Sequence, residues 1–401
     1  MTANNPEYLP VPGIRLGTVC AGIKKRDKRD LVVVELAPGS NTAAVFTQNA
    51  FCAAPVTVAR QHLGTVMPRY LLINTGYANA GTGSQGLEDA AQCCVALASL
   101  TDCKKEEILP FSTGVIGESL PVDKLTKALP AVLEQLTLHG WSEAAWGIMT
   151  TDTRPKLISR TINIQDRQIT LTGIAKGAGM IRPDMATMLA FITTDARVNP
   201  VLLQACLHDA VEQSFNRITV DGDTSTNDAC VLCATGQSGV EIPATGEANN
   251  AFRQTVADLC VELAKGIVRD GEGSTKLINV QVIGGRNQSE CLAVAYTVAH
   301  SPLVKTAFFA SDPNWGRILA AVGRAGMADL DITVINIFLD EVCIVRNGER
   351  DTDYTETQGQ AVMARNEITV RIELERGTDS ANVWTCDFSY DYVRINAEYR
   401  T

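Results

Sequence analysis

The residue with the most suggestive setting for chemistry is Thr187, in the stretch GIAKGAGMIRPDMATMLAFITTDA at residues 173–196. A strand-like run leads into a glycine-rich bend, and Thr187 begins a second apolar run, TMLAFITT. A hydroxyl there could attack the preceding carbonyl, that of Ala186, and hydrolysis of the resulting ester would cut the chain. The new terminal amine, with an ordinary pKa of roughly 7.7–8.0, could then act as the base for the hydroxyl. Taken alone, the pattern favours a plain glycine turn between two strands.

Other side chains capable of chemistry stand in weaker patterns. Cys230 and Cys233 form a CxxC, which could indicate a metal or redox site. No second CxxC or CxxH accompanies it, and CVLCATG is typical of a strand running into a turn. The segment TVDGDTSTND (219–228) offers aspartates for calcium but lacks the full loop spacing and the closing glutamate. None of the four histidines lies in a segment that suggests a site, so the sequence predicts neither a histidine-based triad nor a zinc site.

The elements that must position these residues alternate between strands and helices. Strands are predicted from β-branched and alternating residues at 31–36, 43–47, 69–76 and 158–164. Helices are predicted at 87–100, 122–136, 201–215 and 250–270, the last with one apolar stripe and a glycine-rich end. After residue 276 the chain becomes strand-rich, at KLINVQVIGG, DITVINIFLD, EITVRIELERG, ANVWTCDFS and YVRINAEYR, with helices near 290–300 and 315–326. We therefore expect an α/β protein with a second, smaller α/β domain at 277–401.

Composition sets the limits on function. The chain has 401 residues, of which 45% are hydrophobic and 20% charged, as in globular proteins of about two domains. A formal net charge of −10 argues against a nucleic-acid-binding surface. Met1 to Pro12 lacks the pattern of a secretory signal, and no apolar run approaches the roughly 18 residues of a membrane span. Twelve cysteines among aliphatic neighbours predict reduced thiols in a cytoplasmic protein.

A set of segments in order along almost the whole chain resembles the ornithine acetyltransferase family. They are FTQNAFCAAPV (46–56), PFSTGVIGE (110–118), MTTDTRPK (149–156), KGAGMIRPDMATML (176–189), TVDGDTSTND (219–228), RDGEGSTK (269–276), DPNWGR (312–317) and INAEYRT (395–401). The resemblance implies a self-processing, N-terminal-nucleophile-like fold with αββα layers. The catalytic domain would be 1–276, cut between Ala186 and Thr187 into an α chain (1–186) and a β chain that begins at 187.

The resemblance also implies residue roles. Thr187 matches the nucleophile, while Thr113 and Gly114 match the oxyanion hole. A Ser-Thr-Gly turn can direct a hydroxyl and a backbone N–H at one point, although Ser112 and Thr113 would equally suit the start of a helix. INTGYANAGTG (73–83) departs from the family pattern, with Thr75 and Tyr77 where relatives more often have Ser and Asn.

Substrate binding is implied for a further set of positions: Thr150, Lys176, Thr187, Glu272, Asn396 and Thr401. By charge, Lys176 suits a substrate carboxylate and Glu272 suits the side-chain amine of ornithine. Taken singly, either residue is more typical of a solvated surface charge. A functional C-terminus further predicts that the last strand is held near the site, because chain ends are otherwise frayed.

The activity implied by the resemblance is acetyl transfer from N-acetylornithine to glutamate through an acetyl-Thr187 intermediate, in arginine biosynthesis. No metal or organic cofactor is implied, and acetyl-CoA stays open as a further donor. Two α and two β chains would form a heterotetramer. Two alternatives are a self-processing aminopeptidase or amidase of related fold, which would hydrolyse instead of transferring, and a non-enzymatic binding protein.

Overall fold

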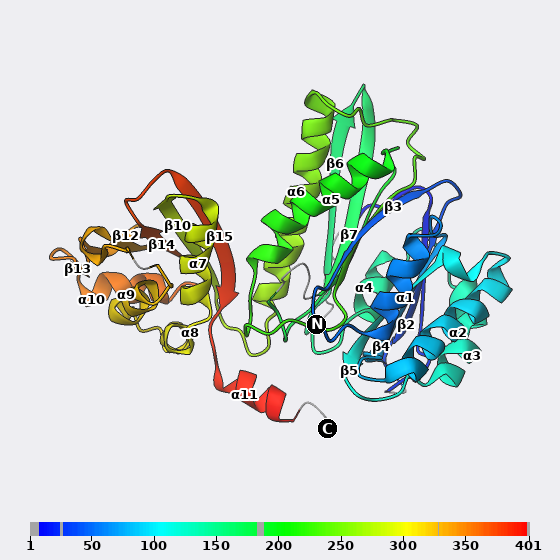
Figure 1. Cartoon of the computed structure of the whole chain (residues 1–401), viewed down its shortest axis with the longest axis horizontal. Coiled ribbons are helices and arrows are strands. Elements are labelled where there is room, and N and C mark those ends of the chain that lie inside the picture. The colour runs from blue at the N-terminus through cyan, green and yellow to red at the C-terminus, as the bar shows by residue number, and fades with distance from the viewer. Residues whose placement is uncertain (1–7, 25–26, 183–187, 328, 399–401) are drawn as a thin grey trace. The chain divides into compact units, whose positions relative to one another are not determined.

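The computed structural model describes residues 8–24, 27–182, 188–327 and 329–398 (Figure 1). The chain divides into two compact units. Unit 1 comprises Met1–Asn216 and Asp223–Ile267, and unit 2 comprises Arg217–Gly222 and Val268–Thr401. Each unit contains both strands and helices, so the predicted α/β class is confirmed. None of the described helices is long and apolar enough to cross a membrane.

Unit 1 contains two β-sheets. The first has the strand order β1-β2-β4-β5, formed by Ile14–Val19, Leu31–Leu36, Tyr70–Tyr77 and Ile108–Val115. The second has the order β3-β9-β8-β7-β6, formed by Asn41–Phe46, Ala229–Ala234, Leu189–Thr194, Arg167–Lys176 and Lys156–Ile164. Each sheet has one parallel pair, β4 with β5 and β8 with β9, and its other neighbours are antiparallel. The strands predicted at 31–36, 43–47, 69–76 and 158–164 are thereby confirmed.

The two sheets of unit 1 pack face to face. Successive side chains of a strand point to opposite faces, so Val32 and Val34 enter the core between the sheets, while Leu31 and Val33 enter the core on the outer face. Phe111 of the first sheet meets Phe191 of the second edge to face, with ring centroids 5.1 Å apart.

Helices cover both outer faces. Those on the first sheet are α1 (Ala54–Leu63), α2 (Gly83–Thr101) and α3 (Val122–Glu134), and those on the second are α5 (Pro200–Gln213) and α6 (Glu247–Arg269) (Figure 1). A short helix, α4 (Trp141–Gly147), contributes to the core between the sheets. The predicted αββα layering is confirmed, as are the helices expected at 87–100, 122–136, 201–215 and 250–270.

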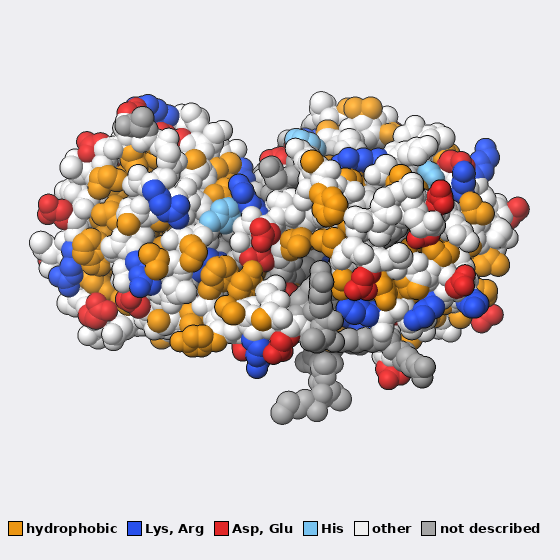
Figure 2. Space-filling view, turned by 60° about the horizontal axis from the view of Figure 1, so that its bottom comes forward, with side chains coloured by type: hydrophobic (Ala, Val, Ile, Leu, Met, Phe, Trp, Pro, Cys, Tyr) orange, Lys and Arg blue, Asp and Glu red, His pale blue; other side chains and the backbone are white. Residues whose placement is uncertain are grey.

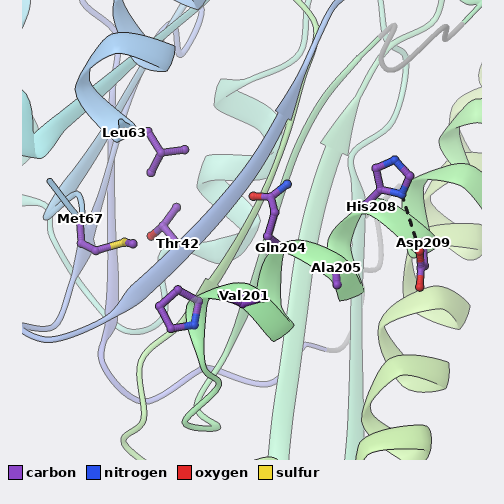
Figure 3. A pocket seen from close by; sticks show the side chains of 9 residues that line it. Thr42, Leu63, Met67, Val201, Gln204, Ala205, His208 and Asp209 are labelled. Carbon is purple, nitrogen blue, oxygen red and sulfur yellow. Dashed lines mark ion pairs between the residues drawn. The ribbon is translucent and has the colours of Figure 1, made fainter. Parts of the chain in front are cut away.

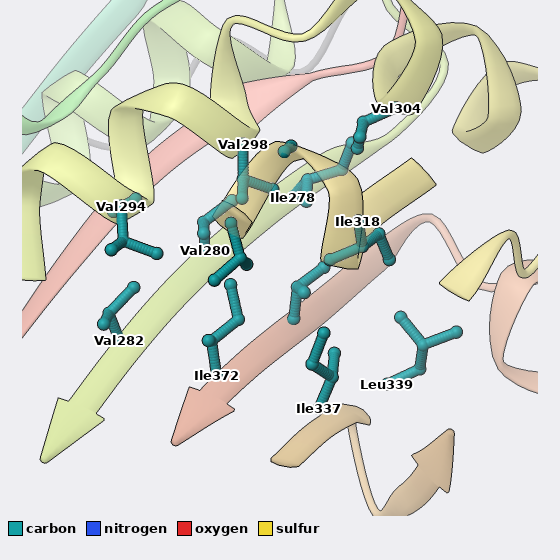
Figure 4. Close-up of a cluster of buried hydrophobic side chains, with 14 of the residues drawn as sticks. Ile278, Val280, Val282, Val294, Val298, Val304, Ile318, Ile337, Leu339 and Ile372 are labelled. Atoms are coloured by element: carbon teal, nitrogen blue, oxygen red, sulfur yellow. The ribbon is translucent and has the colours of Figure 1, made fainter. Parts of the chain in front are cut away.

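Unit 2 is built on one six-stranded sheet with the order β13-β12-β11-β14-β10-β15. These strands are Glu349–Arg350, Val342–Arg346, Asn336–Leu339, Glu367–Glu373, Leu277–Gly285 and Asp379–Cys386. Its helices are α7 (Gln288–Ala299), α8 (Pro302–Phe309), α9 (Trp315–Gly323), α10 (Glu356–Met363) and α11 (Tyr390–Ala397). Val280 and Val282 of β10 pack against Val294 and Val298 of α7 in the core (Figure 4).

Two segments of unit 2 differ from the predicted strands. YVRINAEYR alternates apolar and polar residues, but Tyr390–Ala397 forms helix α11, because the Ser389 hydroxyl accepts a hydrogen bond from the Asp391 amide and caps its first turn. In DITVINIFLD, Asp331 caps a short 3₁₀ turn at Ile332–Val334, and the strand begins only at Asn336. In both places a local side-chain cap overrides the alternating pattern.

Candidate active site

The predicted site residues fall into three groups. Unit 1 holds Thr113, Gly114, Thr150 and Lys176, and unit 2 holds Glu272 and Asn396. The cleavage residues Ala186 and Thr187, and the terminal Thr401, lie outside the described residues.

Thr113 and Gly114 lie near the end of strand β5. They pair in parallel with Thr75 and Gly76 of β4, so the alternative of a helix start at this position is wrong. Gly114 has φ +138°, and a Cβ added there would lie 2.2 Å from the carbonyl carbon of Gly76. Glycine is therefore required, because a side chain would push β4 and β5 apart.

A layer of buried polar groups supports this strand end. The Ser112 hydroxyl donates to Asn74 Oδ1 (2.6 Å), and Asn227 Nδ2 donates to the carbonyls of Ser112 (2.9 Å) and Ala78 (2.6 Å). These bonds tie β4 and β5 to the segment TVDGDTSTND. Sequence reasoning assigned no role to Asn227, although that segment was among those resembling the family.

Lys176 brings three of the predicted residues together. It ends strand β7, is 8% exposed, and its Nζ donates to Thr150 Oγ1 (2.7 Å) and to Thr113 Oγ1 (3.3 Å). A buried ammonium that contacts two hydroxyls is not the solvated surface charge that a single lysine usually represents. The proposed oxyanion hydroxyl and two proposed binding residues thus form one hydrogen-bonded cluster.

Asp152 lies behind this cluster, and sequence reasoning missed it. Its Oδ1 accepts from Lys156 Nζ (2.5 Å) and the Gly177 amide (2.7 Å), and its Oδ2 accepts from the Thr150 amide (3.0 Å) and lies 4.0 Å from Lys176 Nζ. Burial alone would raise the pKa of Asp152, but the charges of Lys176 and Lys156 and the hydrogen bonds hold this pKa well below its ordinary value. Asp152 is therefore an anion at neutral pH.

Asp228, immediately before β9, is a second buried acid, but its pKa is shifted in the opposite direction. Burial raises its pKa well above the ordinary value, against the smaller opposing effects of hydrogen bonds from Ser225 and the Met188 amide and of the Lys176 charge. Within the described ranges, its Oδ2 has no hydrogen-bond partner. The neighbouring Ala229 amide donates to the Met188 carbonyl, one residue after Thr187 in the sequence. The raised pKa favours the protonated form of Asp228, which stands beside Met188, the residue after Thr187.

Glu272 and Asn396 meet in unit 2. Asn396 Nδ2, on α11, donates to Glu272 Oε2 (2.8 Å). Gly273 has φ +71°, and a Cβ added there would lie 2.6 Å from the Tyr392 amide nitrogen, so glycine permits this close approach to α11.

A buried carboxylate holds the loop that carries Glu272. Asp387 accepts from the amides of Thr275 (2.8 Å) and Lys276 (2.9 Å) and from the Thr275 hydroxyl (2.5 Å). Because Asp387 lies just before α11, it fixes the loop and the helix to each other. Two of the predicted binding residues therefore converge although they are far apart in sequence.

Comparisons with known proteins agree with the family that the sequence motifs predict. The ArgJ family profile matches residues 15–401. The chain belongs to the ArgJ family. It is 58% identical over 401 residues to the arginine biosynthesis bifunctional protein ArgJ of Pseudomonas syringae pv. tomato, covering 99% of this chain and 98% of that one. It is 60% identical over 393 residues to the protein of the same name from Methylococcus capsulatus, covering 98% and 96%.

Two solved structures are also similar. The arginine biosynthesis bifunctional protein of Bacillus halodurans is 39% identical, with a TM-score of 0.51 over 53% of this chain and 99% of that chain. The ornithine acetyltransferase of Mycobacterium tuberculosis, solved in complex with ornithine, is 38% identical, with a TM-score of 0.41 over 44% and 93%. The predicted family and the predicted acyltransferase class of arginine biosynthesis are confirmed.

Thr75 and Tyr77, which we predicted from the sequence to depart from the family pattern, both lie in strand β4. Thr75 is buried and is the direct neighbour of Thr113 in the β4–β5 ladder. Tyr77 is half-buried and pairs with Val115, one residue beyond Gly114. Both residues therefore lie against strand β5, which carries Thr113 and Gly114.

The weaker candidates have structural explanations. Cys230 and Cys233 lie in strand β9, three residues apart and so on opposite faces, and burial raises the pKa of Cys233 to about 12. The predicted strand is confirmed, and both thiols are buried and protonated. All twelve cysteines lie in the described part of the chain as free thiols. Among the described residues, no group of three or more His, Cys, Asp or Glu is placed to hold a metal ion.

One surface hollow lies on unit 1. An open hollow of about 710 Å³ is lined by Thr42, Leu63, Met67, Pro200, Val201, Gln204, Ala205, His208 and Asp209 (Figure 3). Val201 is 80% exposed, and none of the described site residues lines this hollow. On the face shown in Figure 2, the described Lys and Arg side chains are interspersed with Asp and Glu.

Proposed function

We propose that this ArgJ family member transfers the acetyl group of N-acetylornithine to glutamate through an acetyl-Thr187 intermediate. The observation that carries the proposal is the convergence of Lys176, Thr150 and Thr113 at the ends of β7 and β5. Lys176 is also the direct ladder partner of Leu189, which follows Thr187 by two positions in the sequence. The ordered family segments and the identity of 58–60% to named ArgJ proteins support the same activity.

The reaction proceeds in two acyl transfers. The Thr187 hydroxyl attacks the acetyl carbonyl, and the Thr113 hydroxyl and the Gly114 amide stabilise the oxyanion. Collapse of the tetrahedral intermediate expels ornithine and leaves the acetyl group as an ester on Thr187. The amine of glutamate then attacks this ester, and N-acetylglutamate leaves. The free amine of Thr187 takes up and returns the proton in each half-reaction.

Charge complementarity supports the substrate assignment. Lys176 is a cation suited to the α-carboxylate, which N-acetylornithine and glutamate share. Glu272 is an anion suited to the side-chain amine of ornithine, and Asn396 orients it through the 2.8 Å hydrogen bond. Thr150, Thr187 and Thr401 complete the proposed binding set. Acetyl-CoA is a second donor in this proposal, supported by the designation of the relatives as bifunctional.

Self-cleavage between Ala186 and Thr187 generates the nucleophile. It would leave 401 − 186 = 215 residues in the β chain, or about 54% of the whole. The solved Bacillus halodurans chain aligns over 53% of this chain while 99% of its own length is covered. A relative whose separate chain corresponds to about half of the precursor supports this cleavage. Two α and two β chains form the proposed heterotetramer, and the free cysteines support a cytoplasmic location.

The first test of the proposal is covalent labelling. Purified protein is mixed with N-acetylornithine that carries a labelled acetyl group, and the fragments are separated and sequenced from their N-termini. We expect the label on the fragment that begins at Thr187, and parallel double-reciprocal plots at several fixed glutamate concentrations. Thr187→Ala is expected to remain one unlabelled chain, because no hydroxyl is left to attack the Ala186 carbonyl.

Three outcomes would contradict the proposal. Processing that survives in Thr187→Ala would remove the nucleophile assignment. Intersecting plots with no labelled fragment would indicate direct transfer in a ternary complex. Acetyl release at a rate that glutamate does not stimulate would indicate a hydrolase, the aminopeptidase-like alternative.

A further inference from the structure

Asp152 connects backbone and side chains from three separate segments of unit 1. Its carboxylate accepts from the amide of Thr150 and from the amide of Gly177, which follows strand β7. It also contacts the ammonium groups of Lys156, at the start of β6, and of Lys176, at the end of β7. The Asp152 side chain is fully buried. One carboxylate therefore sets where Thr150 and Lys176 stand relative to each other.

The two lysines engage this carboxylate in different ways. Lys156 Nζ lies 2.5 Å from Asp152 Oδ1 and also donates to the Gly177 carbonyl (3.3 Å). Lys176 Nζ lies 4.0 Å from Asp152 Oδ2, beyond hydrogen-bond distance, and donates instead to the hydroxyls of Thr150 and Thr113. Asp152 thus attracts the Lys176 charge without occupying its hydrogen-bond donors.

The contact between Lys176 and Thr113 decides where the Thr113 proton points. A lysine ammonium has donors and no acceptor, so in this pair the Thr113 oxygen must accept. The hydroxyl hydrogen of Thr113 is then directed away from Lys176 and is available to another acceptor. A positive charge on the oxygen's accepting side also polarises the O–H bond and makes it a stronger donor.

We propose that Asp152 is a positioning residue of the acetyl-transfer site, which holds Lys176 against Thr113 so that the Thr113 proton points at the oxyanion. This inference rests on the proposed function, because it takes Thr113 as an oxyanion donor. Lys176 then stabilises the transition state through Thr113, in addition to attracting the substrate carboxylate. Preorganised donors of this kind are effective because they need no reorientation as the negative charge develops.

The charge of Asp152 can be removed with little change in shape. Since the pKa of Asp152 is held well below its ordinary value, the wild-type side chain is ionised at every pH used for assays. In Asp152→Asn, the amide nitrogen must replace one oxygen, and both oxygens accept hydrogen bonds. Whichever way the amide turns, its nitrogen faces a donor, and the attraction for Lys176 is lost.

The experiment is a double-mutant cycle between Asp152→Asn and Thr113→Ala. The kcat for acetyl transfer from N-acetylornithine is measured for both single variants, the double variant and the wild type. We expect Asp152→Asn to lower kcat about 10- to 100-fold in the wild-type background, the range of a charge-assisted hydrogen bond. In the Thr113→Ala background the same substitution should change kcat by less than about threefold, because the hydroxyl it positions is absent.

Lys156→Met is the matched control. It removes the closest partner of the same carboxylate, and Lys156 donates to Asp152 and Gly177 instead of to the threonine hydroxyls. We expect Lys156→Met to lower the melting temperature. The loss of kcat caused by Thr113→Ala should be as large in the Lys156→Met variant as in the wild type. Equal losses of kcat from Asp152→Asn in both backgrounds, or a change confined to KM, would overturn the inference.

The cycle remains decisive if Asp152→Asn does not fold. Lys176→Met then takes its place, and its loss of kcat should again be much smaller in the Thr113→Ala background. Additive losses would show that Lys176 acts on the substrate alone, and the inference would fail. If the wild-type protein itself neither self-cleaves nor transfers acetyl groups, the proposed function fails instead, so the two failures are distinguishable.

Discussion

The two groups of proposed site residues are held in contrasting ways. In unit 1, Lys176 and Thr113 come from strand ends, and the fully buried Asp152 stands behind them. In unit 2, Asn396 is exposed on α11, a helix of eight residues with none of its side chains fully buried. In unit 1 the sheet ladders and the buried Asp152 fix the site residues directly. In unit 2 Glu272 is buried and Asp387 holds its loop, but its partner Asn396 stands on a short, exposed helix.

This difference has a physical consequence for each group. A short helix gains little stability from its own hydrogen bonds, so α11 relies on a few contacts. These include the Ser389 cap, the stacking of Phe388 on Tyr392 at 4.7 Å, the edge-to-face contact of Tyr390 with Phe309, and the close approach of Gly273. We therefore expect substitutions in the first group to act mainly on kcat, and substitutions in the second group to act mainly on the choice of substrate.

The largest expected effect tests the fixed geometry. Thr113→Ala should lower kcat by about 10²–10³, the usual effect of losing one oxyanion donor, and should change KM much less. Ser112→Ala is the matched control, because Ser112 precedes Thr113 on β5 and its hydroxyl donates to Asn74 of the neighbouring strand β4. Steady-state kinetics on both variants makes the comparison. A change in KM alone for Thr113→Ala would make Thr113 a binding residue, and equal losses in both variants would indicate damage to β5.

The next effect tests the division of roles between the units. Glu272→Gln should weaken N-acetylornithine more than glutamate, because only ornithine carries the side-chain cation. Lys176→Met should weaken both substrates, because both carry the α-carboxylate. The measured quantity is the ratio of kcat/KM for the two substrates, which we expect to shift about tenfold in Glu272→Gln, the scale of one charge-assisted contact. An unchanged ratio in Glu272→Gln, or a shifted ratio in Lys176→Met, would contradict the roles proposed for these two residues.

The smallest expected effect is on the pH dependence of the free energy of unfolding, to which the buried acids Asp152 and Asp228 of unit 1 contribute with different pH dependence. The pKa of Asp228 is raised in the folded protein, so folding retains a proton that the unfolded chain releases above its ordinary pKa of about 3.9. Its contribution therefore becomes less favourable as the pH rises from that value toward the raised pKa. The pKa of Asp152 is lowered, so its contribution is fully present above about 3.9 and is lost only in stronger acid.

Denaturant unfolding between pH 5 and 8 checks these signs, with about 1.4 kcal/mol per pH unit as the upper limit for one group. The Thr187→Ala background should keep every sample as a single chain. Asp228→Asn should gain stability relative to its parent as the pH rises, while Asp152→Asn should be less stable than its parent by a constant amount. A parallel pH response in both variants would contradict the assigned pKa shifts.

The sequence by itself determined the α/β class, most elements of both units and the family. These followed from patterns that are local in the chain, such as the alternation in LVVVEL, the apolar stripe of α6 and the ordered motifs. The same motifs predicted Thr113, Thr150 and Lys176 as site residues, and hydrogen bonds join these three in the structure. The alternating pattern failed at YVRINAEYR, where the Ser389 cap selects a helix.

Only the tertiary structure decided which groups support those residues and with what charge. Asp152 and Asp228 are the same residue type, yet two lysines lower the pKa of the first, while burial raises the pKa of the second. Asn227 reaches the carbonyl of Ser112 across 115 positions of sequence, and Asn396 reaches Glu272 across 124. Burial and charge pairing depend on distances in space, which the order of residues along the chain does not contain.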